Sequence, residues 1–274
     1  MNLSQSAFRA NGASRVSPLL NPDGTPNLAE GFLEAMGQVL GTGVGAADVI
    51  SYIAGVVSHT GFTSHLAEEL ETPGIRVPFT AENELWDQAV RLGEEVIWLH
   101  SYGELFHDKF GRDVKKGFDG VLPSYQSTVS EMPETKSYDP QTRILRVGTS
   151  GAWHNVAPEV AAYDVGGSKI LDLWFKFRQR NPKGRKGSPL DDINQIVWPA
   201  EWSQELTELL VVLTRLRALE TEQASLLKRI MGGSILTKDS KELSSVKFGA
   251  SKLKPKYPMT STADQLSIYP ESGV

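Results

Sequence analysis

The sequence contains no cysteine, so the fold can hold neither disulfide bonds nor thiolate-bound metal ions. A reducing, cytoplasmic location is the natural expectation for such a chain. Long apolar runs are also missing: no stretch of 18 apolar residues occurs, and the first 27 residues lack the apolar core of a secretory signal. We therefore expect no membrane-spanning segment and no membrane partner.

Motifs of the common enzyme classes are absent as well. There is no G-x-x-x-x-G-K-[ST] phosphate loop, no H-E-x-x-H zinc motif and no G-x-S-x-G nucleophile elbow. The glycines of GTGVG, at residues 41–45, lie between two predicted helices, whereas a dinucleotide-binding loop follows a strand. None of the five histidines has metal-ligand spacing. These absences predict a chain without catalysis, cofactor or bound metal.

Charge is distributed unevenly along a chain of otherwise ordinary composition. Of the 274 residues, 40% are hydrophobic and 22% are charged, as in a typical soluble protein, and the net charge is −5. Residues 1–137 hold 9 Lys and Arg against 18 Asp and Glu, whereas residues 138–274 hold 19 against 15. Because the acidic half should repel a polyanion, we expect any nucleic-acid surface in the second half.

The pattern of apolar residues predicts an α+β fold. We expect a helical N-terminal half packed on a mixed β-region, which carries a basic helix and a long C-terminal helix. The predicted parts are a flexible leader (1–27), a mainly helical subdomain (28–135), a β-hairpin and helix subdomain for DNA recognition (136–237) and a mobile tail (238–274).

Two long helices have a clear buried face in the sequence. The first is expected to start at Thr80 as N-cap, and its apolar residues recur at steps of three and four: Leu85, Ala89, Leu92, Val96 and Leu99. The second follows Trp198-Pro199, with Thr221 as a potential break. Its apolar residues show the same spacing: Trp202, Leu206, Leu209, Leu213 and Leu216.

The region between these helices changes character. KSYDPQTRILRVG (136–148) predicts a β-hairpin, because Asp-Pro-Gln-Thr supplies turn chemistry and Ile-Leu-Arg-Val, at residues 144–147, supplies a strand. GAWHNVA and EVAAYDV continue as strand-like segments. The pair Gly166-Gly167 then predicts the passage into a helix, whose apolar ridge should be buried: Ile170, Leu171, Trp174 and Phe177.

The segment from Gly166 to Gly187 concentrates positive charge. It holds seven cations and one anion, Asp172, which gives a net charge of +6 in an acidic chain. A solvated helix face normally mixes both signs, so this imbalance favours binding of a polyanion. The polyanion would contact a helical stripe formed by Lys169, Lys176 and Arg180 and the glycine-rich loop that follows it. Two arginines of the preceding hairpin are expected to add a second contact. The predicted DNA-binding residues are Lys169, Lys176, Arg178, Arg180, Lys183, Arg185, Lys186, Arg143 and Arg146.

Four segments also carry a family resemblance: residues 72–106, the YDPQTRILRVG hairpin, residues 158–193 and residues 198–216. Together they resemble the C-terminal specificity domain of single-polypeptide type ISP restriction–modification enzymes, over roughly residues 45–231 and in the family's order. The resemblance implies a domain that reads the target site in double-stranded DNA, with nuclease, helicase and methyltransferase parts upstream. The chain would then be a separate specificity subunit, a remnant of a split gene or an excised domain.

The sequence leaves two other functions open. The acidic helical half is also suited to a protein-interaction module that docks a helicase or methyltransferase chain, and this role is compatible with DNA binding. A metal-dependent nuclease would use the neighbouring carboxylates Asp191 and Asp192. Adjacent residues do not naturally converge on one ion, so SPLDDIN is better explained as a turn and a helix cap.

Overall fold

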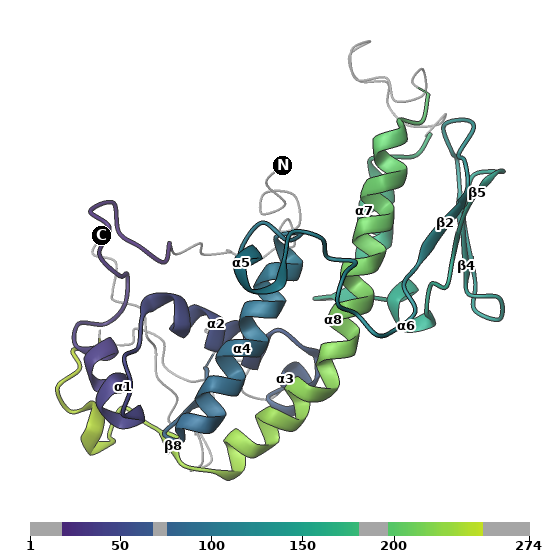
Figure 1. Cartoon of the computed structure of the whole chain (residues 1–274). Helices are drawn as coiled ribbons and strands as arrows, with labels where there is room; N and C mark the ends of the chain where they lie inside the picture. The colour runs from purple at the N-terminus through teal and green to yellow at the C-terminus, as the bar shows by residue number, and fades with distance from the viewer. Residues whose placement is uncertain (1–17, 68–75, 181–196, 249–274) are drawn as a thin grey trace. The chain divides into compact units, whose positions relative to one another are not determined.

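The computed structural model describes residues 18–67, 76–180 and 197–248 (Figure 1). The chain forms two compact units. The sheet unit comprises Leu99–Ala218, and the helical unit comprises Ala13–Trp98 with Leu219–Val274, in so far as these residues are described. Two long helices, α4 (Asn83–His100) and α8 (Ala200–Gly232), contribute residues to both units. Each unit is described below by itself.

The helical unit consists of short helices and one small sheet. Strands β1 (Phe79–Thr80) and β8 (Ile235–Leu236) pair in antiparallel orientation. The helices are α1 (Phe32–Leu40), α2 (Ala46–Val57), α3 (Thr60–His65) and the adjoining parts of α4 and α8. The sequence shows three short helical patterns, near residues 28–40, 47–58 and 62–71, and these lie close to α1, α2 and α3. The α+β class is confirmed, and within the described residues no helix has the length and apolar character needed to cross a membrane.

Aromatic rings form the centre of this unit's core. Tyr52 stacks on Phe79 at 5.1 Å and on Trp86 at 4.5 Å between ring centroids. Its hydroxyl donates to the carbonyl oxygen of Pro78 at 2.7 Å and accepts from the amide of Thr80 at 3.1 Å. A buried phenol is stable when its polar end is bonded in this way, so Tyr52 fixes β1 against α2.

The predicted buried face of α4 is confirmed, since the five apolar residues predicted for it are all buried. The helix begins at Asn83, three residues after the predicted N-cap. Thr80 belongs to β1 instead, and its hydroxyl accepts from the amide of Glu82 at 3.1 Å. The strand takes Thr80 because its amide and side chain are fully buried against Tyr52.

Helices α2 and α4 approach each other through two glycines. A Cβ atom at Gly93 would lie 1.6 Å from the carbonyl oxygen of Ser51, and one at Gly55 would lie 2.2 Å from that of Ala89. Only residues without a side chain permit this contact. From α8, the amide of Gln223 donates to the carbonyl oxygen of Gly55 at 2.9 Å, so the same crossing is bonded to a third helix.

Residues 238–248 pack on the helical unit, although the sequence analysis assigns them to a mobile tail. A 3₁₀ turn, η5 (Lys241–Leu243), contacts α1. Leu243 and Val246, three residues apart, are buried in the core, and the amide of Lys247 donates to the carbonyl oxygen of Glu30 at 3.0 Å. Two apolar residues at this spacing are too few for a periodic signal, which explains the difference. Residues 249–274 of the predicted tail lie outside the described residues.

The sheet unit is built on a four-stranded antiparallel sheet. Its order is β2-β5-β4-β3, and the strands lie side by side in Figure 1. The bounds are β2 (Ser124–Ser127), β3 (Lys136–Asp139), β4 (Ile144–Val147) and β5 (Gly151–His154). The predicted hairpin of residues 136–148 is confirmed as β3 and β4, and Asp139 closes its turn by accepting from the amide of Gln141 at 2.9 Å.

One face of the sheet packs on α8. Leu145, Val147 and Trp153 are buried on this face, and the indole of Trp153 donates to the Thr207 hydroxyl of α8 at 2.8 Å. Side chains alternate along a strand, so Arg146, between Leu145 and Val147, belongs to the opposite face and is exposed.

Three details between residues 155 and 232 differ from the predictions. EVAAYDV contains a helical turn, α6 (Pro158–Ala161), because Pro158 occupies the first helical position, which suits its fixed φ. Strands β6 (Asp164–Val165) and β7 (Ser168–Lys169) then form a small hairpin with Gly166-Gly167 as its turn. Helix α8 is continuous from Ala200 to Gly232, since threonine at position 221 costs a packed helix little.

The basic helix is short. It is α7 (Ile170–Lys176), and it begins three residues after the predicted start at Gly167. Leu171 and Phe175 are buried, as an i, i+4 pair on one face, but Phe177 is 65% exposed. The prediction that Phe177 closes a buried ridge is therefore wrong, because the helix ends before it.

Candidate nucleic-acid interface

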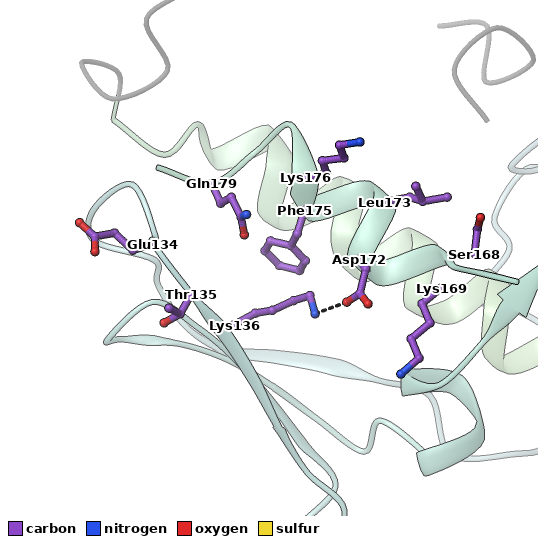
Figure 2. Close-up of a pocket in the computed structure, with 10 residues that line it drawn as sticks. All are labelled: Glu134, Thr135, Lys136, Ser168, Lys169, Asp172, Leu173, Phe175, Lys176 and Gln179. Atoms are coloured by element: carbon purple, nitrogen blue, oxygen red, sulfur yellow. Dashed lines mark hydrogen bonds and ion pairs between the residues drawn. The ribbon is translucent and has the colours of Figure 1, made fainter. Parts of the chain in front are cut away.

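A groove of about 510 Å³ lies in the sheet unit between the start of β3 and helix α7 (Figure 2). Strand β3 and the residues before it form one wall, and the end of β7 with α7 forms the other. The lining residues are Glu134, Thr135, Lys136, Ser168, Lys169, Asp172, Leu173, Phe175, Lys176 and Gln179. Three of them are lysines and two are carboxylates, so the lining carries a net positive charge.

Lys136 and Asp172 form an ion pair across this groove. The ammonium of Lys136 also lies 5.8 Å from the ring centroid of Phe175. Lys136 is not among the DNA-binding residues predicted from the sequence, because it stands 33 residues before Lys169 in the chain. The strand alternation was a usable signal, because it places Lys136 with Tyr138 on the face that meets the helices.

Two predicted cations, Lys169 and Lys176, line the same groove and are exposed. Lys169 ends β7 and is the N-cap of α7, so it does not belong to the helix. Figure 2 shows Lys169 on the side of Asp172, whereas Lys176 extends from the other side of the helix. The Lys176 ammonium lies 5.6 Å from the exposed ring of Phe177. The predicted helical stripe of Lys169, Lys176 and Arg180 is thus not formed.

Arg178 contacts α8. Its guanidinium lies 4.3 Å from the ring of Trp174 and 5.5 Å from that of Trp202. It donates to the Glu205 carboxylate at 3.1 Å and to the backbone oxygen of Trp174 at 3.2 Å, and only 21% of its side chain is exposed. Such a desolvated, paired guanidinium joins the end of α7 to α8.

Arg180 lies at the end of the groove near Glu134. Its backbone amide donates to the carbonyl oxygen of Pro133 at 2.6 Å, and its guanidinium is 3.8 Å from the Glu134 carboxylate. This carboxylate offsets part of the charge of Arg180. Three further predicted cations, Lys183, Arg185 and Lys186, lie outside the described residues, as do Asp191 and Asp192.

The two hairpin arginines lie apart from the groove lining. Arg146 pairs in register with Ser137 and Ala152, on the sheet face opposite to α8. Arg143 precedes β4 in the turn, with a positive φ of 54°. The structure therefore brings Lys136, Lys169 and Lys176 together, but not Arg143 or Arg146.

Within the described ranges, no group of three or more His, Asp or Glu residues is arranged to hold a metal ion. Burial lowers the pKa of His59 and that of His100, which favours neutral rings. Burial raises the pKa of Tyr102, assisted by the nearby carboxylates of Glu208 and Glu205. These groups lie outside the groove lining, and their pKa shifts concern folding.

Solved structures that are similar to this chain include three in complex with DNA or a DNA mimic. The DrdV–DNA complex matches 77% of this chain and 20% of its own, with 13% identity and a TM-score of 0.51. The match to the ATP-dependent Type ISP restriction–modification enzyme LlaBIII bound to DNA covers 70% of this chain and 12% of the LlaBIII chain, with 16% identity and a TM-score of 0.46. The third match is a nuclease-deletion mutant of the Type ISP restriction–modification enzyme LlaGI in complex with a DNA substrate mimic. It covers 69% of this chain and 14% of the LlaGI chain, with 16% identity and a TM-score of 0.43.

This chain therefore spans a fifth or less of each of these solved chains. No curated protein matches it in sequence. The family comparison is decisive: the sequence model of the Type ISP C-terminal specificity domain matches residues 3–209, well over half of the chain. The resemblance found in the sequence is confirmed, and the chain belongs to the family of Type ISP C-terminal specificity domains.

Proposed function

We propose that the chain binds double-stranded DNA and recognises the target site of a Type ISP restriction–modification system. The observation that carries this proposal is the lysine-lined groove between β3 and α7, in a chain of the specificity family. The DrdV chain that shares its fold is in complex with DNA, which supports the same ligand here.

Phosphate contacts position the chain on the duplex in this proposal. Lys169 and Lys176 are exposed, and among the residues that the structure describes neither forms an ion pair with a carboxylate, so both are available to DNA phosphates. Lys136 is held in its ion pair with Asp172. The predicted loop cations at 183, 185 and 186 extend this contact. Arg178 acts indirectly, because its contacts hold α7 in place. Four phosphate contacts would give a log–log salt slope of about −3.6.

Catalysis belongs to other parts of the enzyme in this proposal. The chain serves as a non-catalytic specificity module and works with a helicase and methyltransferase chain that carries the nuclease. The family description supports this division, since it denotes specificity alone. The chain acts in the cytoplasm, where the cellular DNA lies. Incoming phage DNA is the target of this defence.

Salt-dependent binding of the full chain to a duplex tests the proposal. The double variant Lys169→Ala/Lys176→Ala should flatten the log–log salt slope by about 1.8 if each lysine contacts one phosphate. The matched control is Lys228→Ala/Lys241→Ala, which removes two exposed lysines of the helical unit and should leave the slope unchanged. Duplex binding that is insensitive to salt, or equal slopes in both variants, would refute the proposal.

A further inference from the structure

The β6–β7 hairpin has an open tip. Val165 pairs with Ser168 and Asp164 with Lys169, so the turn consists of two residues. Gly166 and Gly167 have φ values of 60° and 80°, and positive φ at both positions is what a type I′ turn requires. A Cβ atom added at either glycine would meet no atom within 4 Å. The described part of the chain therefore leaves space around the tip for another molecule.

Hydrogen bonds and a cation–π contact hold the base of this hairpin in place. The amide of Ile170 donates to the carbonyl oxygen of Tyr163 at 3.0 Å, and the amide of Gly167 donates to the Asp164 carboxylate at 2.8 Å. Tyr163 is buried, and the Arg217 guanidinium lies 4.6 Å from its ring. A short two-stranded hairpin is marginal alone, so these contacts preorganise it.

The two strands of the hairpin face different surroundings. Ser168 and Lys169, on the second strand, line the lysine-bearing groove (Figure 2). Val165, on the first strand, is 54% exposed although it is apolar. A single exposed valine is ordinary, but this one stands beside a side-chain-free tip and next to the proposed phosphate contacts. The arrangement combines an apolar contact with a cation on one rigid ribbon.

We infer that the β6–β7 hairpin enters the major groove of the DNA and that Val165 contacts the C5-methyl group of a thymine. This inference rests on the proposed function. A major groove about 12 Å wide admits a two-stranded ribbon, and the thymine methyl is the apolar group that distinguishes bases there. The Gly-Gly tip lets the backbone approach the base edges, while Lys169 binds a neighbouring phosphate. Val165 is thus a specificity-determining residue.

The experiment starts from a duplex selected by the full chain out of a random-sequence library. Each thymine of the selected site is then replaced by uracil, which removes only the methyl group. One replacement should weaken wild-type binding about fourfold, the value of one buried methyl group. In Val165→Ala the same replacement should have no effect. Val121→Ala, which shortens another exposed valine of the sheet unit, is the matched control and should respond to uracil as the wild type does.

A second variant tests the tip itself. Gly166→Asn should fold normally, because Asn-Gly is the preferred pair for a type I′ turn and an added Cβ atom at this position meets no atom within 4 Å. It should nevertheless bind the selected duplex at least tenfold more weakly, since the side chain obstructs the base edges. An unchanged melting temperature in both Gly166→Asn and Val165→Ala shows that the hairpin remains folded.

The outcomes separate this inference from the proposed function. If the wild type selects no duplex, the proposed function fails and the hairpin inference fails with it. If the wild type selects a site but no uracil replacement weakens binding, or Val165→Ala keeps the same uracil penalty, the hairpin inference alone is overturned. A Gly166→Asn variant that binds like the wild type also overturns the inference and leaves the proposed function intact.

Discussion

The guanidinium of Arg178 lies 4.3 Å from the ring of Trp174 while it bonds to Glu205 of α8 at 3.1 Å. The residue thus belongs to the packing between two helices, although its sequence context suggests a surface cation. We predict that Arg178→Lys lowers the free energy of unfolding by about 1–2 kcal/mol, because lysine cannot stack on the ring and bond the carboxylate together. Chemical denaturation of the full chain measures this change.

Arg180→Lys is the matched control for this prediction, since the 3.8 Å pair with Glu134 is more exposed and should contribute less than about 1 kcal/mol. In DNA binding, Arg178→Lys should keep the salt slope of the wild type. A slope reduced by about 0.9 with unchanged stability would show that Arg178 contacts a phosphate directly.

The ion pair of Lys136 and Asp172 predicts tighter non-specific binding when the carboxylate is removed. In Asp172→Asn, the Lys136 ammonium no longer has its partner in the groove and becomes available to a phosphate. The log–log salt slope should then steepen by about 0.9. Asp239→Asn, an equal charge change at an exposed position of the helical unit, should not alter it. Weaker binding by Asp172→Asn than by this control would contradict the prediction.

The crossing of α2 and α4 predicts a severe effect of Gly93→Ala. The new methyl group would lie 1.6 Å from the Ser51 carbonyl oxygen, which belongs to the backbone and cannot rotate away. The helices must separate, and we expect a loss of about 3 kcal/mol or more in the free energy of unfolding. Gly43→Ala, where a Cβ atom meets nothing within 4 Å, should change stability by no more than about 0.5 kcal/mol. Equal melting temperatures for the two variants would refute this account.

Two histidines with a lowered pKa, His59 and His100, predict acid sensitivity of the fold. Burial lowers the folded-state pKa of His59 and of His100 below the usual value, so the unfolded chain binds protons more readily than the folded chain. Their contribution to stability is complete above the unfolded pKa of about 6.5 and is lost as the pH falls through the lowered folded-state values. Denaturation between pH 7 and pH 5 should show the loss, and His59→Gln should show a smaller dependence on pH.

Sequence periodicity was sufficient where a long element packs one face. The burial of Leu85, Ala89 and Val96 follows from helical spacing alone, and the hairpin of β3 and β4 follows from turn chemistry next to a strand-forming segment. Neither prediction needed knowledge of distant contacts, because the signal and the structure are both local.

The groove could not be predicted from the sequence in the same way, because its two walls are distant in sequence. Lys136 joins Asp172 only through the packing of β3 against α7, and Arg178 meets Trp202 and Glu205 only through that of α7 against α8. A count of charges along one segment finds Lys169 and Lys176 but assigns Arg178 to the same surface. The β6–β7 hairpin was missed because strands of two residues carry no period.

The packing of residues 238–248 shows that the folded helical unit extends beyond the end of the family match. The family match ends at residue 209, whereas buried side chains of the helical unit continue through Ile230, Leu236, Leu243 and Val246. A version truncated at the end of the family match would uncover the interior around α1 and α2 and would be prone to aggregation. A minimal recombinant form should therefore extend at least to Phe248, nearly forty residues past the end of the family match.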